Sequence, residues 1–286
     1  MDDFARRVLR WYDAAARDLP WRQPGVSAWA ILVSEVMLQQ TPVARVEPVW
    51  QEWMQRWPSP RALAAAAAGD AVRAWGRLGY PRRALRLHAA AAAIVDRYGG
   101  EVPSSYDELR TLPGVGDYTA AAVAAFAFDR GQPVLDTNVR RVYGRVFDGS
   151  DDRSRAPTAS ERSAAQERLP ARRPGAYSVA VMELGALVCT ARAPRCEACP
   201  LRSDCRWHSG GRPQASQRRP AQRYEGTDRQ ARGRLLAVLR QQHDPVSRAR
   251  LDAAWPDAAQ RARALSGLIE DGLVEATGDG HFRLPA

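Results

Sequence analysis

Two carboxylates stand where acid–base chemistry is expected. Glu35 lies in an otherwise apolar helical stretch, and burial raises the pKa of a carboxyl group, as a general acid working near neutral pH requires. Asp136 precedes an arginine-rich amphipathic run at 139–142. Each residue also has a structural interpretation: Glu35 as a partly exposed side chain on an amphipathic helix, and Asp136 as an ordinary helix N-cap. Both are candidates for a catalytic pair.

Four cysteines within 17 residues form a candidate metal site with the spacing C-x6-C-x2-C-x5-C. Disulfides would be reduced in a cytosolic protein, so this density of thiols favours a metal. Zinc is one alternative, although its sites usually show two close C-x2-C pairs and this segment has one. The four residues are Cys189, Cys196, Cys199 and Cys205.

A glycine-rich turn is the third feature that could bind a ligand. It runs Pro113-Gly114-Val115-Gly116 between two helical patterns, and its glycines allow the positive φ and close approach that a tight hairpin needs. The helix that follows, at 118–128, begins with unpaired N–H groups. Such a helix start can bind a phosphate oxygen of DNA.

The composition fits a nucleic-acid partner. The chain has 286 residues, 45% of them apolar, with a net charge of +10, so it can bury a core and attract a polyanion, with a membrane surface as a weaker alternative. No apolar run reaches membrane-spanning length and the acidic N-terminus does not open a signal peptide, so we expect a cytoplasmic bacterial protein. All 42 basic residues are arginine. Without lysine, no side-chain amine can form a Schiff base with an abasic sugar.

The elements expected to position these residues are helices. Apolar spacing predicts helices at 4–17, 28–40, 46–56, 60–68, 70–77, 82–98 and 176–188. Residues 209–228 read as a basic linker. Beyond it, the patterns at 229–241, 247–254 and 257–270 with strands at 273–276 and 281–284 predict a winged-helix-like module that either contacts DNA or packs against the rest.

Three motifs together resemble the endonuclease III superfamily of DNA glycosylases, over about residues 1–208. They are the helix-hairpin-helix followed by Asp136, the cysteine spacing, and Ser34–Thr41, whose run SEVMLQQT matches the MutY adenine DNA glycosylases at every position. The resemblance implies an all-α, two-lobed fold: residues 1–24 with 136–208, and 25–135 with the helix-hairpin-helix at 109–127. DNA would lie between the lobes. It also implies a 4Fe-4S cluster on the four cysteines, which we expect mainly to order the 189–205 loop, with the loop 191–195 contacting phosphate.

The same resemblance assigns roles to individual residues. Glu35 would protonate adenine, and Asp136 would stabilise the cationic sugar, with Asn138 holding Asp136 or the water, or simply capping a helix. Tyr118 stands where lyase members carry their Schiff-base lysine, which implies a monofunctional glycosylase. The substrate would be double-stranded DNA with a mismatched or oxidised base pair, bound by a monomer that flips the base. Implied DNA contacts are Gln40, Tyr80, Leu112, Gly114, Val115, Gly116 and Thr119; implied base-pocket residues are Trp21, Arg22 and Leu38, with a core tryptophan and a surface arginine as the alternative for the first two.

Three departures from the family pattern keep other substrates open. Pro81 follows Tyr80 where many members have a second tyrosine, Val179 stands where a hydrogen-bonding Glu or Gln is usual, and the C-terminal segment is too short for the nudix-like domain that inspects 8-oxoguanine. The first alternative is therefore removal of thymine or uracil opposite guanine. The second is a non-enzymatic iron–sulfur DNA-binding regulator, for which Glu35 and Asp136 would have no role.

Overall fold

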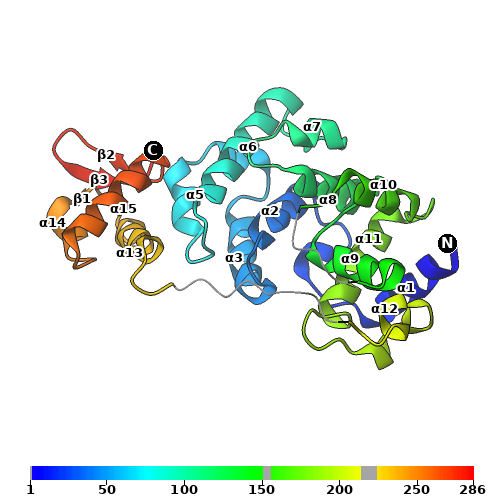
Figure 1. Cartoon of the computed structure of the whole chain (residues 1–286). Helices are drawn as coiled ribbons and strands as arrows, with labels where there is room; N and C mark the ends of the chain where they lie inside the picture. The colour runs from blue at the N-terminus through cyan, green and yellow to red at the C-terminus, as the bar shows by residue number, and fades with distance from the viewer. Residues whose placement is uncertain (1, 151–155, 214–223) are drawn as a thin grey trace. The chain divides into compact units, whose positions relative to one another are not determined.

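The computed structural model describes residues 2–150, 156–213 and 224–286, and it is built almost entirely from helices (Figure 1). The predicted all-α architecture is confirmed. The chain divides into two compact units: residues 1–35, 103–111 and 115–219, and residues 36–102, 112–114 and 220–286. Within the described ranges, no helix is both long enough and apolar enough to span a bilayer.

The first unit is centred on α11 (Pro174–Leu187), which packs against α1 (Asp2–Ala15), α8 (Asp117–Phe128) and α9 (Thr137–Tyr143). Its core includes Val8, Val142, Tyr177 and Leu184. The remaining elements are η1 (Pro20–Arg22), α7 (Tyr106–Arg110), the π-helical turn η2 (Gly144–Asp148), α10 (Ala159–Glu167), η3 (Cys196–Ala198), η4 (Arg202–Asp204) and α12 (Arg206–Ser209); α2 (Ala28–Leu38) begins in this unit.

Small residues allow the helices of this unit to approach one another closely. The alanine-rich α8 packs on α11 at Gly175, where an added Cβ would overlap the carbonyl oxygen of Ala125. Likewise, a Cβ on Gly185 would lie 2.7 Å from the Cβ of Asn138 on α9. This packing groups α8 with the cysteine-bearing segment, which differs from the expected boundary at residue 135.

The second unit contains α3 (Val43–Arg56), α4 (Pro60–Ala64), α5 (Ala68–Ala74) and α6 (Arg82–Tyr98). Three buried tryptophans stack edge-on between these helices, with ring centroids 4.8 Å apart for Trp53 and Trp57 and 5.6 Å apart for Trp53 and Trp75. These indole contacts fix the end of α5, from which the chain enters the segment at 75–81.

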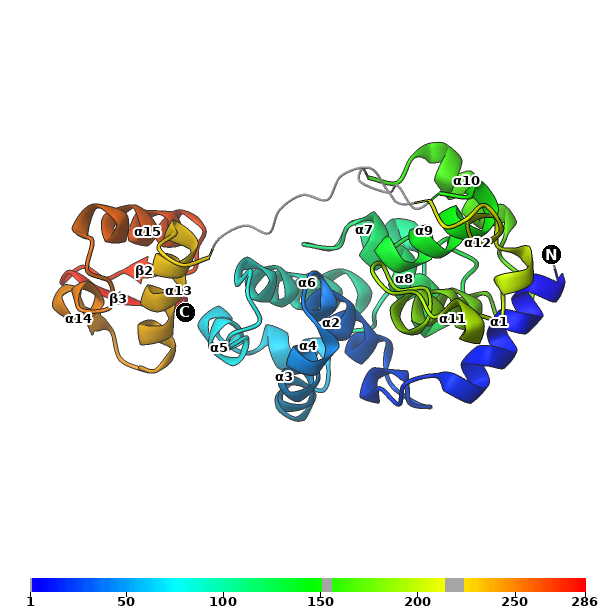
Figure 2. The ribbon, with the colours of Figure 1, turned by 60° about the horizontal axis from the view of Figure 1, so that its bottom comes forward.

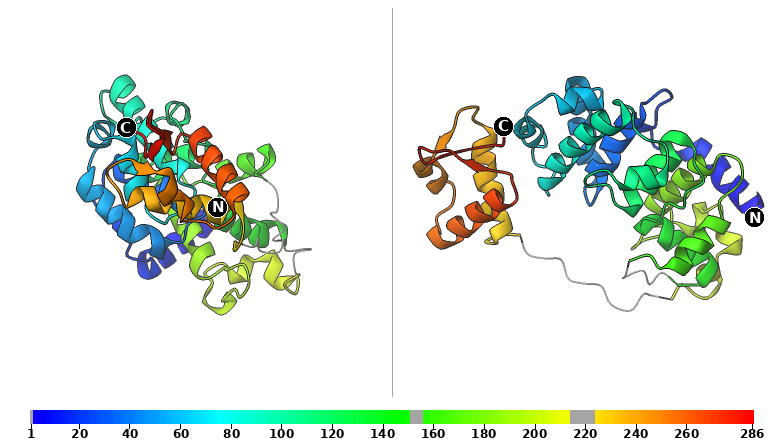
Figure 3. Two further views of the ribbon diagram at one scale, coloured as in Figure 1. Left: turned by 90° about the vertical axis from the view of Figure 1, so that its left-hand side faces the viewer. Right: turned by 90° about the horizontal axis from the view of Figure 1, so that it is seen from above.

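The C-terminal module (residues 224–286) follows in the same unit. It comprises α13 (Asp228–Arg240), β1 (Val246–Ser247), α14 (Arg248–Asp252), α15 (Ala258–Glu270), β2 (Glu275–Ala276) and β3 (His281–Arg283). The three strands form an antiparallel sheet in the order β1-β3-β2, beside α13 and α15 (Figures 2 and 3). The three helices and the hairpin occur where predicted; β1 was not expected. The winged-helix designation stays a prediction, and residues 214–223 of the predicted linker lie outside the described residues.

Candidate active site and metal centre

Glu35 is a buried carboxyl group held by a tyrosine. It lies on the apolar helix α2 with 6% of its surface exposed, and Oε2 accepts a hydrogen bond of 3.0 Å from the Tyr118 hydroxyl on α8. Burial raises the pKa of Glu35 to about 7, although the Tyr118 hydrogen bond and the charge of Arg22 pull it down and the charge of Asp136 pushes it up. A carboxyl group with this pKa can donate a proton near neutral pH.

Asp136 is a helix cap and also part of this site. One carboxylate oxygen accepts the backbone N–H of Val139 at 2.6 Å, which fixes the start of α9, and the other accepts the side-chain amide of Asn138 at 2.7 Å. Burial raises the pKa of Asp136, and these hydrogen bonds oppose the rise. The cap interpretation and the catalytic interpretation therefore describe the same residue.

The side chain of Asn138 is held in place by Arg141. Its side-chain oxygen accepts a 2.7 Å hydrogen bond from Arg141, whose guanidinium also donates to the carbonyl oxygens of Gly185 and Cys189, each at 2.7 Å. The close contact of Gly185 with Asn138 allows this arrangement. The chain of contacts joins the carboxylate of Asp136 to the backbone of the first cysteine.

Glu183 is a site residue that the sequence did not reveal. It is fully buried on α11 and accepts hydrogen bonds from Arg17 at 2.7 Å and from Arg22 at 3.0 Å. Burial opposes its ionisation, but these hydrogen bonds outweigh burial and lower the pKa of Glu183 to about 2. A single carboxylate within the apolar pattern at 176–188 was the available signal.

Only one of the two terminal nitrogens of the Arg22 guanidinium has a hydrogen-bond partner among the described residues. Its Nη2 contacts Glu183, whereas its Nη1 is buried without a hydrogen-bond partner among the described residues. Of the other predicted pocket residues, Trp21 is buried and Leu38 is half-buried at the end of α2. Val179, which departs from the family pattern, is half-buried on α11. An unpaired buried donor is costly, so Nη1 is suited to an acceptor on a ligand.

The predicted DNA-contact residues of the hairpin differ in exposure. Gly116 caps α8 and is open to solvent, and Gly114 has a positive φ of 77° with the side chain of Arg86 against it. The side chains of Leu112, Val115 and Thr119 are buried, so any contact with DNA from these three must come from the backbone.

Gln40 and Tyr80 are both exposed and both have left-handed backbone, with φ of 56° and 48°. One buried guanidinium fixes the two segments. Arg83 donates to the carbonyl oxygens of Gln39 at 2.6 Å and Gly79 at 3.0 Å, to the Thr41 hydroxyl at 3.0 Å, and to the end of α2. Non-glycine residues with positive φ persist only where the surroundings enforce them, and Arg83 supplies that enforcement.

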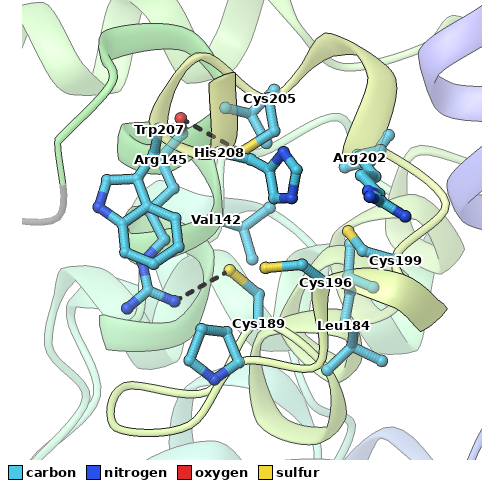
Figure 4. Close-up of a pocket in the computed structure, with 14 residues that line it drawn as sticks. Val142, Arg145, Leu184, Cys189, Cys196, Cys199, Arg202, Cys205, Trp207 and His208 are labelled. Atoms are coloured by element: carbon cyan, nitrogen blue, oxygen red, sulfur yellow. Dashed lines mark hydrogen bonds between the residues drawn. The ribbon is translucent and has the colours of Figure 1, made fainter. Parts of the chain in front are cut away.

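The four cysteines line one cavity between α9, η2 and the loop after α11, and they form no disulfide with one another (Figure 4). Arg145, almost wholly buried against the Trp207 ring, donates to Cys189 Sγ at 3.4 Å and to the Thr190 carbonyl at 2.8 Å. Burial raises the pKa of Cys199 to about 11, so a cationic group is needed to hold its thiolate. No three acidic, His or Cys side chains among the described residues gather closely enough for a single ion. The residues fit a cluster that four thiolates hold from different sides.

Comparison with known proteins agrees with this geometry. The HhH-GPD superfamily of base excision DNA repair proteins matches residues 33–168, and the iron–sulfur binding domain of endonuclease III matches residues 189–205. Adenine DNA glycosylases from Mycolicibacterium smegmatis and Mycobacterium tuberculosis are 57% and 54% identical; both alignments cover 97% of this chain, and 94% and 92% of the relatives. The chain belongs to the adenine DNA glycosylase family. The predicted 4Fe-4S cluster is thereby confirmed, and the zinc alternative is not supported.

Two solved structures share the fold of this family member. A thermostable thymine-DNA glycosylase superimposes with a TM-score of 0.67 at 26% identity, covering 73% of this chain and 96% of its own. A trapped covalent complex of endonuclease III with DNA gives 0.62 at 25% identity, covering 72% and 94%. The resemblance to the DNA-bound endonuclease III supports DNA as the partner.

Proposed function

We propose that this family member hydrolyses the N-glycosidic bond of adenine mispaired with 8-oxoguanine or guanine in double-stranded DNA. The observation that carries the proposal is the group formed by the buried Glu35 and the half-buried Tyr118 and Asp136. Adenine leaves poorly unless it is protonated, and Glu35, with its pKa near 7, is the proton donor. The DNA substrate also supports a cytoplasmic enzyme, and we expect it to act as a monomer.

Asp136 acts on the sugar. Loss of the base leaves an oxocarbenium-like cation, and a fixed carboxylate beside it lowers its free energy, as in the hydrolysis of O-glycosides. The hydrogen bonds from Val139 and Asn138 keep the carboxylate in place and favour its charged form. Water then adds to the sugar cation, and the proton that it loses returns to the carboxylate that Glu35 became on protonating adenine. Because the chain has no lysine, and Tyr118 donates to Glu35, no side chain is placed to attack the sugar as an amine.

The base must leave the helix to reach buried Glu35. We propose that Trp21 and the free Nη1 of Arg22 receive it, because Arg22 is oriented by Glu183 and still has a donor to offer. Val179 adds an apolar contact in place of a hydrogen bond. Leu38, at the end of α2, would line the pocket beside these residues.

The DNA would be held by the hairpin and by two exposed side chains. The backbone N–H groups of residues 114–116, and those at the start of α8, suit a phosphate. Gln40 fills the space of the flipped base and Tyr80 lies beside the opposite base. The four cysteines would hold the iron–sulfur cluster, and the bound cluster would give the segment 189–205 a single conformation. In that conformation its arginines would face the phosphates of the DNA.

Single-turnover base release tests the proposal. Wild type and Asp136→Asn are compared on duplexes with A opposite 8-oxoguanine, A opposite G, T opposite G and U opposite G, with alkali added to cleave abasic sites. We expect release from the adenine duplexes alone, and none from the variant. Release of thymine or uracil would establish the alternative substrate. Equal behaviour of the variant would favour the regulator, and strand cleavage without alkali would contradict a monofunctional enzyme.

A further inference from the structure

The C-terminal module contacts both flanks of the segment that carries Tyr80, which we call the Tyr80 loop (residues 75–81). On the first flank, α5 and α13 end against each other. Arg73 of α5 donates to the carbonyl oxygens of Arg240 at 2.6 Å and Gln242 at 2.7 Å, while Arg240 donates to the carbonyl oxygen of Val72 at 2.9 Å. The last carbonyls of a helix have no partner within it, so each arginine caps the other helix.

On the second flank, an acidic residue of the module forms an ion pair with the first residue of α6. Asp271, just after α15, forms an ion pair with Arg82 at 3.0 Å and a second with Arg232 of α13. Arg82 is the first residue of α6 and follows the Tyr80 loop directly. Gly272 packs against Leu85, which lies one turn further along α6; an added Cβ at Gly272 would lie 3.9 Å from the leucine Cδ1.

A third contact fixes the end of the chain on α5. The Gly69 backbone N–H donates to the carbonyl oxygen of Pro285 at 2.7 Å, and a side chain at Gly69 would overlap that oxygen. The three contacts involve separate parts of the module: the end of α13, the turn after α15 and the segment after β3. Together they leave the module little freedom to rotate on α5 and α6.

The Tyr80 loop transmits the position of its flanks to Tyr80. The indole N–H of Trp75 donates to the carbonyl oxygen of Gly79 at 2.9 Å, and Arg83 donates to the same oxygen at 3.0 Å. Gly76, Gly79 and Tyr80 have positive φ, so the path is fixed and cannot relax without breaking these contacts. A shift of α5 relative to α6 would therefore move Tyr80.

The charge of the module argues against DNA reading as its purpose. Residues 224–286 contain nine arginines and nine acidic residues, so the net +10 of the chain resides entirely outside them. The exposed face of α15, where a winged helix would read DNA, offers one arginine, and Arg263 is paired with Asp228. A domain that grips DNA usually presents unpaired basic residues.

We propose that the C-terminal module is a brace that positions Tyr80 for recognition of the base pair, a role that rests on the proposed function. The module acts on specificity through the Tyr80 loop, because its contacts lie on both flanks of that loop. Arg73 and Asp271 are its positioning residues.

The test compares two full-length double variants of equal charge. Arg73→Met/Asp271→Asn breaks both flanking contacts, whereas Arg283→Met/Asp252→Asn removes an arginine and an aspartate that pair only within the module. Hydrogen exchange of peptides covering residues 75–82 reports the loop directly. Single-turnover excision from A opposite 8-oxoguanine is then measured with Tyr80 and with Tyr80→Ala.

We expect faster exchange at 75–82 and about tenfold slower excision for the first variant, with less than about twofold change for the second. In the Tyr80→Ala background, the first variant should add no further loss. Unchanged exchange would overturn the brace, and so would an equal loss in both backgrounds. If the double variant does not fold, Asp271→Asn with Asp271→Glu as rescue decides in the same way. A wild type without adenine release refutes the proposed function alone, because exchange still reports the brace.

Discussion

The Tyr118 hydroxyl donates a hydrogen bond to the buried carboxyl group of Glu35 across 3.0 Å. Because this bond lowers the pKa of Glu35 against the larger effect of burial, Tyr118→Phe should raise that pKa above about 7. Excision needs protonated Glu35, so wild-type activity should fall as pH rises through about 7, and in Tyr118→Phe the fall should move to higher pH. Single-turnover rates between pH 5.5 and 9 measure both. If the pH at which activity falls is the same in Tyr118→Phe as in wild type, Tyr118 does not influence the pKa of the acid.

Burial of Glu35 should also cost stability at neutral pH. The native state keeps the proton up to about pH 7 and the unfolded state loses it near 4.5, so stability from this group is present below 4.5 and is lost as pH rises through 7. Glu35→Gln removes this loss. We expect the variant to be inactive, and to gain on the order of 1–3 kcal/mol over wild type between pH 5 and pH 8. Denaturant unfolding at the two pH values measures the gain; an equal difference at both would contradict it.

Asp136→Asn should separate catalysis from capping. Asparagine is as good an N-cap as aspartate, so α9 and the melting temperature should change little. The negative charge beside the sugar is lost, and excision should fall by about a hundredfold or more. Asp257→Asn is the matched control, because Asp257 caps α15 through the Gln260 N–H at 2.7 Å and lies in the C-terminal module. Activity retained in Asp136→Asn would leave only the capping role.

Arg83→Lys should disturb recognition without changing the acid. An ammonium group cannot reach the carbonyls of Gln39 and Gly79 and the Thr41 hydroxyl together, so the segments carrying Gln40 and Tyr80 should loosen. We expect affinity for a mispaired duplex to fall by about tenfold with the pH profile of excision unchanged. An altered pH profile would show that the effect reaches Glu35.

Removal of the cluster should release the segment 189–205. Cys196→Ser should lose iron, measured by absorbance and metal analysis, and weaken DNA binding because the loop arginines are no longer held. Excision chemistry on bound DNA should change less than affinity. Iron loss with full DNA affinity would contradict the expectation that the cluster mainly orders this loop.

The sequence predicted the candidate site residues that are marked by a pattern of their near neighbours in the chain. The apolar helix around Glu35, the amphipathic helix after Asp136 and the glycines of the hairpin are all patterns of neighbouring residues. The hydrogen bond that Glu35 accepts from Tyr118, 83 positions away, is not such a pattern. The helices followed from apolar spacing in the same way. The cysteine spacing alone left zinc as an alternative, and the family resemblance was needed to predict an iron–sulfur cluster.

What the sequence could not supply depends on distant segments. Glu183 gains its low pKa from Arg17 and Arg22, more than 160 positions earlier, and nothing near it signals that pairing. The two-residue β1 is too short to show a pattern and exists because β3 pairs with it. The grouping of α8 with α11 depends on Gly175 meeting Ala125, a contact that spacing alone does not predict.

The double duty of Asp136 has a consequence for heat inactivation. The carboxylate that serves the reaction also ties down the first turn of α9, so it cannot drift unless that turn frays. Helix ends fray at temperatures well below the cooperative melting of a domain. The enzyme should therefore stop working by losing one helical turn while the rest of its fold is still intact, and cooling should restore it at once.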